Sequence, residues 1–175
     1  MASLVDREDL TAMDLARGSM DAARLIAVGP AALDEMGSRF RGAATFGEAA
    51  TSGLYLAAWG GSAHLALIKR ELESNPTKRG WLHRLVGTEE AFLAHLDSGG
   101  RYQPLLQLMP DVGGVRALTH LLMRSKDPLV RRAGLFWGYW LADRAYWNAV
   151  RALAKTERDR TTLRLVQEIL KRASE

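Results

Sequence analysis

The chain has 175 residues, of which 47% are hydrophobic and 25% charged, the composition of a globular protein that can bury a core. It contains no cysteine, which excludes disulfide bonds, cysteine nucleophiles and metal sites made of thiolates. The net charge of +4 is unevenly spread: residues 1–75 carry 7 basic and 10 acidic side chains, and residues 76–175 carry 17 and 10. The basic second part favours an anionic partner; the alternative is an ordinary solvated surface.

The first part of the chain predicts short helices, and no segment shows the period-two alternation of a strand. We expect helices over residues 6–17, 19–28 and 30–40, the last opened by Pro30, because proline suits the first turn of a helix. The first ten residues are polar and acidic rather than basic and then apolar. We therefore expect no secretory signal and a cytoplasmic protein.

Residues 49–68 contain no charged side chain and are long enough to span a bilayer. Gly60-Gly61 divides this window in the middle, and serine, threonine and histidine interrupt it. We therefore predict two buried helices within residues 42–74 that meet at the glycine pair, and no membrane partner. Asn75-Pro76 ends the second helix, because the residue before a proline avoids the helical conformation.

Residues 78–86 and 89–97 predict a further pair of short helices. Gly87 is expected to end the first in the left-handed conformation, and Thr88 to cap the start of the second. The Asp-Ser-Gly-Gly sequence at residues 97–100 predicts a loop that divides the chain into two parts.

Asp127-Pro128 is a strong helix start, with aspartate at the cap and proline at the first helical position. The predicted helices of this part cover residues 102–109, 113–124, 128–141, 144–155 and 160–173. We therefore predict an all-α fold, an array of short antiparallel helices. We expect a single domain over residues 1–175, and a subdivision into a Gly/Ala-rich part, 1–98, and a basic part, 101–175, is left open.

The segment DPLVRRAGLFWGYWL, residues 127–141, resembles the first helix of a HEAT-like repeat. The residues that fall on the pattern are Asp127, Val130, Arg131, Ala133 and Leu141, and about thirty-two residues later Asp159, Leu163 and Arg164. The resemblance implies a HEAT-like α-solenoid in the C-terminal half. It also implies a ladder of ion pairs between repeats, formed by Asp127, Arg131, Asp159 and Arg164. Such arrays serve mostly as binding surfaces.

Residues 132–147 contain six of the thirteen aromatic side chains of the chain. The helix predicted over residues 128–141 is apolar nearly all round, which favours a buried position in the core. Gly134 and Gly138 lie four residues apart, so they form a flat strip where a neighbouring helix can approach closely.

A second interpretation gives part of this block a binding role. If the chain stays helical through residue 147, one row contains Trp140, Asp143, Arg144, Trp147 and Arg151. Aromatic rings alternating with charges hold a flat or cationic group by stacking, so these are the candidate ligand-binding or partner-binding residues. The combination is also similar, in residue type only, to HEAT-like DNA glycosylases that excise alkylated bases.

The leading prediction for function is a non-enzymatic interaction module that binds a protein partner. The alternatives are a nucleic-acid-binding protein and, more remotely, the base-excising enzyme. The candidate nucleic-acid-binding residues are Arg124, Arg131, Arg132, Arg158, Arg160 and Arg164. The four histidines lack metal-ligand spacing, and no nucleophile or phosphate-loop motif is present, so we predict no catalytic residue, metal or cofactor.

Overall fold

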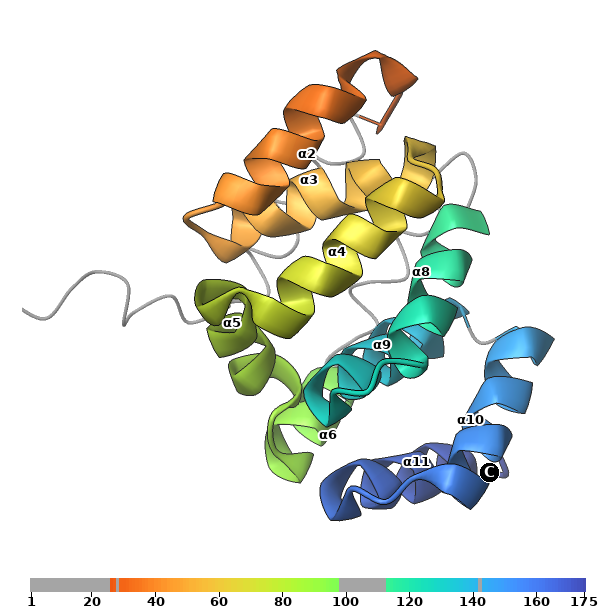
Figure 1. Cartoon of the computed structure of the whole chain (residues 1–175). Helices are drawn as coiled ribbons and strands as arrows, with labels where there is room; N and C mark the ends of the chain where they lie inside the picture. Colours follow the sequence, from red (N-terminus) through yellow and green to blue (C-terminus); the bar gives the residue numbers. More distant parts are fainter. Residues whose placement is uncertain (1–25, 28, 98–112, 142) are drawn as a thin grey trace, which may run out of the picture.

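The computed structural model describes residues 26–27, 29–97, 113–141 and 143–175. Within these ranges the chain is all-helical, as predicted, and its short helices pack in pairs (Figure 1). The elements are η2 Pro30–Ala32, α2 Leu33–Gly42, α3 Phe46–Trp59, α4 Ser62–Ser74, α5 Pro76–Val86, α6 Glu89–Asp97, α8 Gly113–Met123, α9 Pro128–Leu141, α10 Arg144–Thr156 and α11 Arg160–Arg172. The predictions for residues 6–17, most of 19–28, 98–100 and 102–109 lie outside the described residues.

The uncharged window forms two helices, α3 and α4, that meet at Gly60-Gly61 as predicted. A reciprocal capping box places the start of α3 at Phe46: the Glu48 N–H donates to Thr45 Oγ1 at 3.2 Å, and the Thr45 N–H donates to Glu48 Oε2 at 3.2 Å. This box was not predicted, and the helix pair was expected to begin at residue 42. None of the helices described is long and apolar enough to cross a membrane.

Asn75 both ends α4 and begins α5. Its side-chain oxygen accepts hydrogen bonds from the N–H groups of Thr77 (3.1 Å) and Lys78 (3.2 Å), so α5 starts at Pro76, two residues before the predicted position. The predicted N-cap of α6 is confirmed, because the Ala91 N–H donates to Thr88 Oγ1 at 3.1 Å.

The prediction that Gly87 ends α5 in the left-handed conformation is wrong. Its φ of −71° and ψ of −31° are right-handed, and its N–H continues the helical pattern by donating to the His83 carbonyl at 3.0 Å. The Gly87 carbonyl accepts a hydrogen bond from Arg132 of α9 at 2.8 Å. A distant arginine therefore satisfies this helix end, and a left-handed glycine is not needed.

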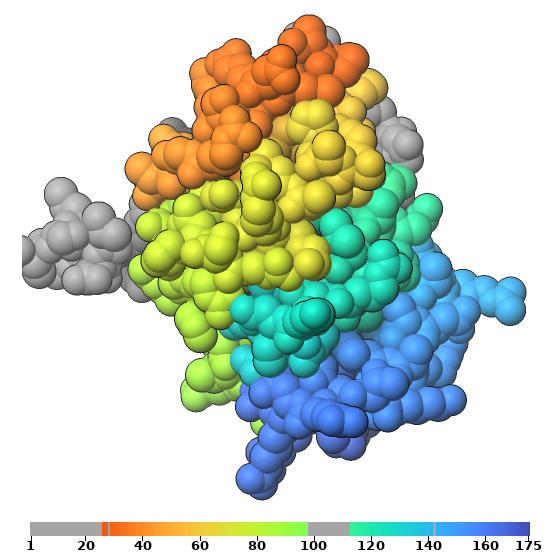
Figure 2. Space-filling model, viewed as in Figure 1, coloured from red at the N-terminus to blue at the C-terminus, as the bar shows by residue number. Residues whose placement is uncertain are grey.

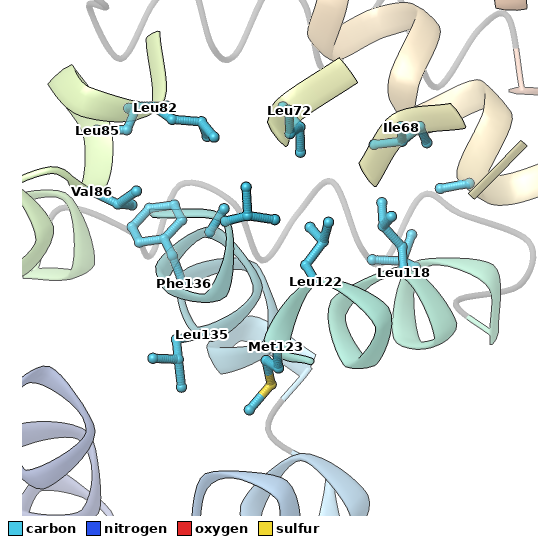
Figure 3. Packing of buried hydrophobic residues seen from close by; sticks show 14 of the residues in the cluster. Ile68, Leu72, Leu82, Leu85, Val86, Leu118, Leu122, Met123, Leu135 and Phe136 are labelled. Atoms are coloured by element: carbon cyan, nitrogen blue, oxygen red, sulfur yellow. The ribbon is translucent and has the colours of Figure 1, made fainter. Parts of the chain in front are cut away.

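Helix α9 lies at the centre of the described structure and packs against α5, α8, α10 and α11 (Figure 1). Figure 3 shows Phe136 of α9 facing Val86 of α5, and Leu118 of α8 facing Ile68 of α4. One cluster of buried side chains extends from Ile26 to Ile169, so the described helices share a core. The prediction of a buried helix is right for most of α9, but Trp137, Tyr139 and Trp140 are only partly buried.

The predicted glycine strip of α9 is confirmed as a site of close approach. A Cβ at Gly134 would lie 2.7 Å from the Met123 backbone nitrogen and 2.9 Å from the Thr119 carbonyl oxygen, both in α8. A Cβ at Gly138 would lie 2.5 Å from the ring of Tyr146. The absence of side chains at these two positions therefore lets α8 and α10 pack directly on the α9 backbone.

Candidate binding surfaces

The predicted row of candidate binding residues from Trp140 to Arg151 does not form on one helix, because the chain is not helical through residue 147. Helix α9 ends at Leu141, and α10 begins at Arg144 with Asp143 as its N-cap. The Asp143 side chain accepts a hydrogen bond from the Tyr146 N–H at 2.8 Å. The aspartate thus starts a new helix instead of standing in a row with Trp140 and Trp147.

Asp143 is also engaged by an ion pair with Arg116 of α8, a partner that the sequence did not indicate. Burial raises the pKa of Asp143, but the hydrogen bonds from Tyr146 and Arg116 outweigh this and hold the pKa below its usual range. The carboxylate therefore stays charged and joins α8 to the start of α10. Arg144 and Arg151 lie exposed on α10.

The aromatic residues of the block form a chain of edge-to-face contacts across the α9–α10 corner. The ring centroid of Tyr139 lies 5.2 Å from that of Trp140 and 6.3 Å from that of Trp147, and Trp147 lies 5.1 Å from Tyr146. The Tyr146 hydroxyl donates to the Leu135 carbonyl at 2.8 Å, and burial raises the pKa of this phenol far above its ordinary value. Tyr146 is a core residue, and Trp147 packs beside it.

The two aspartates assigned to an ion-pair ladder do bond to arginines, but not to those expected. Asp127 pairs with Arg79 of α5, and Asp159 pairs with Arg132 of α9 at 2.8 Å. Arg131 instead binds both carboxylate oxygens of Glu157, each at 2.7 Å. Each aspartate also caps the helix that follows it, so it holds a helix start and a neighbouring helix together.

Two of the candidate nucleic-acid-binding arginines are used inside the fold. Arg132 is 8% exposed and donates to Asp159, to Thr162 and to the carbonyl of Gly87. Arg131, bound to Glu157, also donates to the carbonyls of Ser125 and Lys126. Neither arginine therefore belongs to the candidate nucleic-acid-binding surface. Arg124, Arg158, Arg160 and Arg164 are exposed.

The exposed cations near the C-terminus follow the outer faces of α10 and α11. Two rows share the spacing i, i+4, i+7 and i+11, which places each on one side of its helix. The rows are Arg144, Asn148, Arg151 and Lys155 on α10, and Arg160, Arg164, Gln167 and Lys171 on α11; both are exposed throughout. With Arg158 in the connection, we call these residues the basic hairpin, and it forms one edge of the molecule (Figures 1 and 2).

The acidic residues of α10, α11 and their caps form ion pairs with arginines that are not part of the basic hairpin. Asp143, Glu157 and Asp159 pair with Arg116, Arg131 and Arg132, all outside the hairpin. Glu168 pairs with Arg172 of its own helix at 3.4 Å. Among the described residues, Arg164 is the one cation of the basic hairpin that forms an ion pair, with Glu89 at 3.5 Å. These carboxylates are thus paired with arginines that do not belong to the two rows, and the rows keep their positive charge.

A cavity of about 150 Å³, partly open to the surface, lies between α2, α3, α4, α5, α8 and α9. Its walls are almost entirely apolar and include Trp137 and Trp140 from the aromatic block, together with Trp81 of α5. The sequence did not predict this cavity, because its walls come from six helices spread over about a hundred residues. Only the density of tryptophan in residues 132–147 pointed towards it.

In the described ranges no three His, Asp or Glu side chains converge on a position where they would hold a metal ion. What the arrangement offers is a positively charged edge and an apolar cavity. Comparison of the chain with family models, with curated proteins and with solved structures found no significant match.

Proposed function

We propose that this protein is a non-enzymatic helical binding module and that the basic hairpin is its contact surface for a nucleic acid. The observation that carries the proposal is the separation of charge in α10, α11 and their caps: the carboxylates pair with arginines outside the two rows, and the cations of the rows lie exposed. The sequence favoured a protein partner, and the exposed charges now favour the alternative. An acidic protein surface remains an outcome that the binding experiment distinguishes.

The length of each row suits contact with the phosphate backbone of a nucleic acid. Eleven residues of α-helix extend about 16 Å, because each residue rises about 1.5 Å. A DNA duplex carries one negative charge per about 1.7 Å of its axis, so one row spans many phosphates. Arg144, Arg151, Arg160 and Arg164 present the planar guanidinium that binds phosphate through two hydrogen bonds. These contacts would not depend on the base sequence.

Two finer features belong to the proposal. We place the described helices in a HEAT-like arrangement, supported by the equivalent roles of Asp127 and Asp159, each of which caps a helix and bonds to an arginine of an earlier one. We do not extend the proposal to base excision, because both a helix start and Arg116 engage the Asp143 carboxylate.

The test is fluorescence anisotropy with a labelled DNA duplex and a labelled single strand between about 50 and 200 mM salt. The affinity is expected to fall steeply with salt. The triple variant Arg144→Gln, Arg151→Gln and Lys155→Gln should reduce the slope of log K against log salt by about 0.9 for each phosphate that the variant no longer binds. The matched control replaces Arg41, Arg70 and Arg84, which are exposed on α2, α4 and α5, with glutamine and should change the slope little.

Absence of binding at low salt, or equal losses of affinity in the two triple variants, would overturn the proposal. Polyglutamate provides a further control at equal charge. If it displaces the labelled DNA as well as unlabelled DNA does, the basic hairpin serves an acidic protein instead.

A further inference from the structure

We propose that the cavity between α2–α5, α8 and α9 is a binding site for a small, uncharged aromatic molecule. This inference is independent of the nucleic-acid surface, because the cavity and the basic hairpin share no residue. The residues that line the cavity are Phe40, Phe46, Ala49, Ala50, Gly53, Leu54, Ala57, Ile68, Leu72, Lys78, Trp81, Leu82, Val115, Leu118, Thr119, Trp137 and Trp140.

The size of the cavity matches a single ring. A cavity of about 150 Å³ lined by leucine, isoleucine and phenylalanine is large enough to bind benzene and stays free of water when it offers no polar partner. The cavity of this protein has the same volume, about 150 Å³. Protein interiors are otherwise close-packed, and atoms that line a void lose dispersion contacts on that side. A ligand that fills the space restores these contacts.

The Lys78 ammonium and the Thr119 hydroxyl at the cavity wall already have partners within the protein, so a charged ligand would find no counter-ion there. Lys78 is 1% exposed; its Nζ donates to the Arg41 carbonyl at 3.1 Å and lies 3.3 Å from a carboxylate oxygen of Glu71. The Thr119 hydroxyl donates to the Arg116 carbonyl at 2.8 Å. Moving a charged group into this environment would cost much free energy without a new ion pair to offset it. The ligand is therefore neutral.

The rings around the cavity favour an aromatic ligand over an aliphatic one. Five aromatic side chains line it: Phe40, Phe46, Trp81, Trp137 and Trp140. Phe46 and Trp81 already meet edge to face with centroids 6.1 Å apart, and the Lys78 ammonium lies 5.1 Å from the centre of the Phe40 ring. A planar ring among them makes further edge-to-face contacts, which contribute beyond simple burial of area. The tryptophans also supply a spectroscopic signal for binding.

The experiment measures the melting temperature of the full chain with toluene, hexane or sodium benzoate. Toluene at tenfold its Kd should raise Tm by about 3–6 °C in a saturable manner. Benzoate, which has the ring but carries a charge, should not raise Tm, and hexane should raise it less than toluene. Bromobenzene should quench tryptophan fluorescence with the same saturation behaviour, because three of the five tryptophans line the cavity.

Ala50→Leu places a larger side chain in the cavity and should abolish the toluene shift. The matched control, Ala152→Leu on the exposed face of α10, should keep it. If Ala50→Leu fails to fold, competition between toluene and bromobenzene on the native chain replaces it. Toluene that neither stabilises the native chain nor displaces bromobenzene would overturn the proposal, as would an unchanged shift in folded Ala50→Leu. Equal stabilisation by hexane would replace the aromatic ligand with an aliphatic one.

Discussion

At the scale of single residues, Arg132 joins three helices through one side chain. It belongs to α9, donates to the carboxylate of Asp159 at the start of α11, and donates to the carbonyl of Gly87 at the end of α5. One guanidinium therefore satisfies groups at two distant helix ends. Its five donors in a rigid plane suit this role, which a lysine could not fill.

We predict that Arg132→Met destabilises the protein by about 2–4 kcal/mol, because the Gly87 carbonyl and the Asp159 carboxylate both lose a charged hydrogen-bond donor while partly buried. Methionine keeps most of the volume, so the loss reports the hydrogen bonds and the ion pair. Urea unfolding monitored by circular dichroism measures it. Arg124→Met, at an exposed arginine, should change the free energy of unfolding by less than about 0.5 kcal/mol. Similar values for the two variants would contradict the assigned role.

The Asp159 carboxylate links stability to pH. Burial raises its pKa, but hydrogen bonds from Thr162 and Arg132 outweigh this and lower the pKa to about 2. In the unfolded chain an aspartate has a pKa of about 3.9, so the unfolded state takes up the proton first as the pH falls. The stabilisation by Asp159 is therefore complete above about pH 5 and is lost as the pH falls towards 2.

Asp159→Asn removes this titration and keeps a side chain that caps helices. The difference in unfolding free energy between the native chain and the variant should be constant above about pH 5 and should shrink between about pH 4 and pH 2. Urea titrations at a series of pH values measure it. The titration of the other carboxylates does not contribute to this difference, because these groups are present in both proteins. A difference that does not change with pH would show that Asp159 titrates normally.

At the scale of elements, close approach of backbones decides the geometry of the central helices. Gly134 allows α8 to contact the α9 backbone, with the Met123 nitrogen and the Thr119 carbonyl oxygen in the space that a Cβ would need. Gly80 lies within α5 and has nothing within 4 Å of its Cβ position. The two glycines share the same cost in helix propensity but differ in their surroundings.

Gly80→Ala is expected to stabilise the protein by about 0.5–1 kcal/mol, because alanine reduces the backbone freedom of the unfolded chain. Gly134→Ala should instead destabilise it by about 1–3 kcal/mol, because the backbone of α8 must move. Thermal unfolding of both variants tests whether the two substitutions change the stability in opposite directions. A stabilising Gly134→Ala would show that α8 and α9 can separate without cost.

At the scale of the whole molecule, the charged edge and the apolar cavity lie on different sets of helices. The basic hairpin belongs to α10 and α11, and the cavity is formed by α2–α5, α8 and α9. A ligand changes the affinity of a second site only when it favours one of two conformations that the sites share. We therefore predict that saturating toluene leaves the Kd for DNA unchanged within about twofold, which anisotropy measures. A larger change would mean that the hairpin moves when the cavity fills.

The sequence predicted helix positions well because the signals that start and end helices are local. Asp127, Thr88 and the Gly60-Gly61 pair act within one turn of their own position, so neighbouring residues suffice to recognise them. The all-α class and the glycine strip of α9 followed from the same short-range patterns. Even the errors at Phe46 and Pro76 amounted to a few residues, and they came from caps that were present but overlooked.

Tertiary contacts decided which side chains are available to bind a partner. Three charged residues have the types expected of a binding site but form ion pairs within the protein. Their partners lie far away in the sequence: 26 residues from Arg131, 27 from Arg132 and 27 from Asp143. The cavity likewise needs walls from six helices, and no local pattern specifies how these meet. The backbone hydrogen bonds and caps of a helix depend on neighbours in the chain, whereas burial and the long-range ion pairs depend on neighbours in space, and only the packed structure brings those neighbours together.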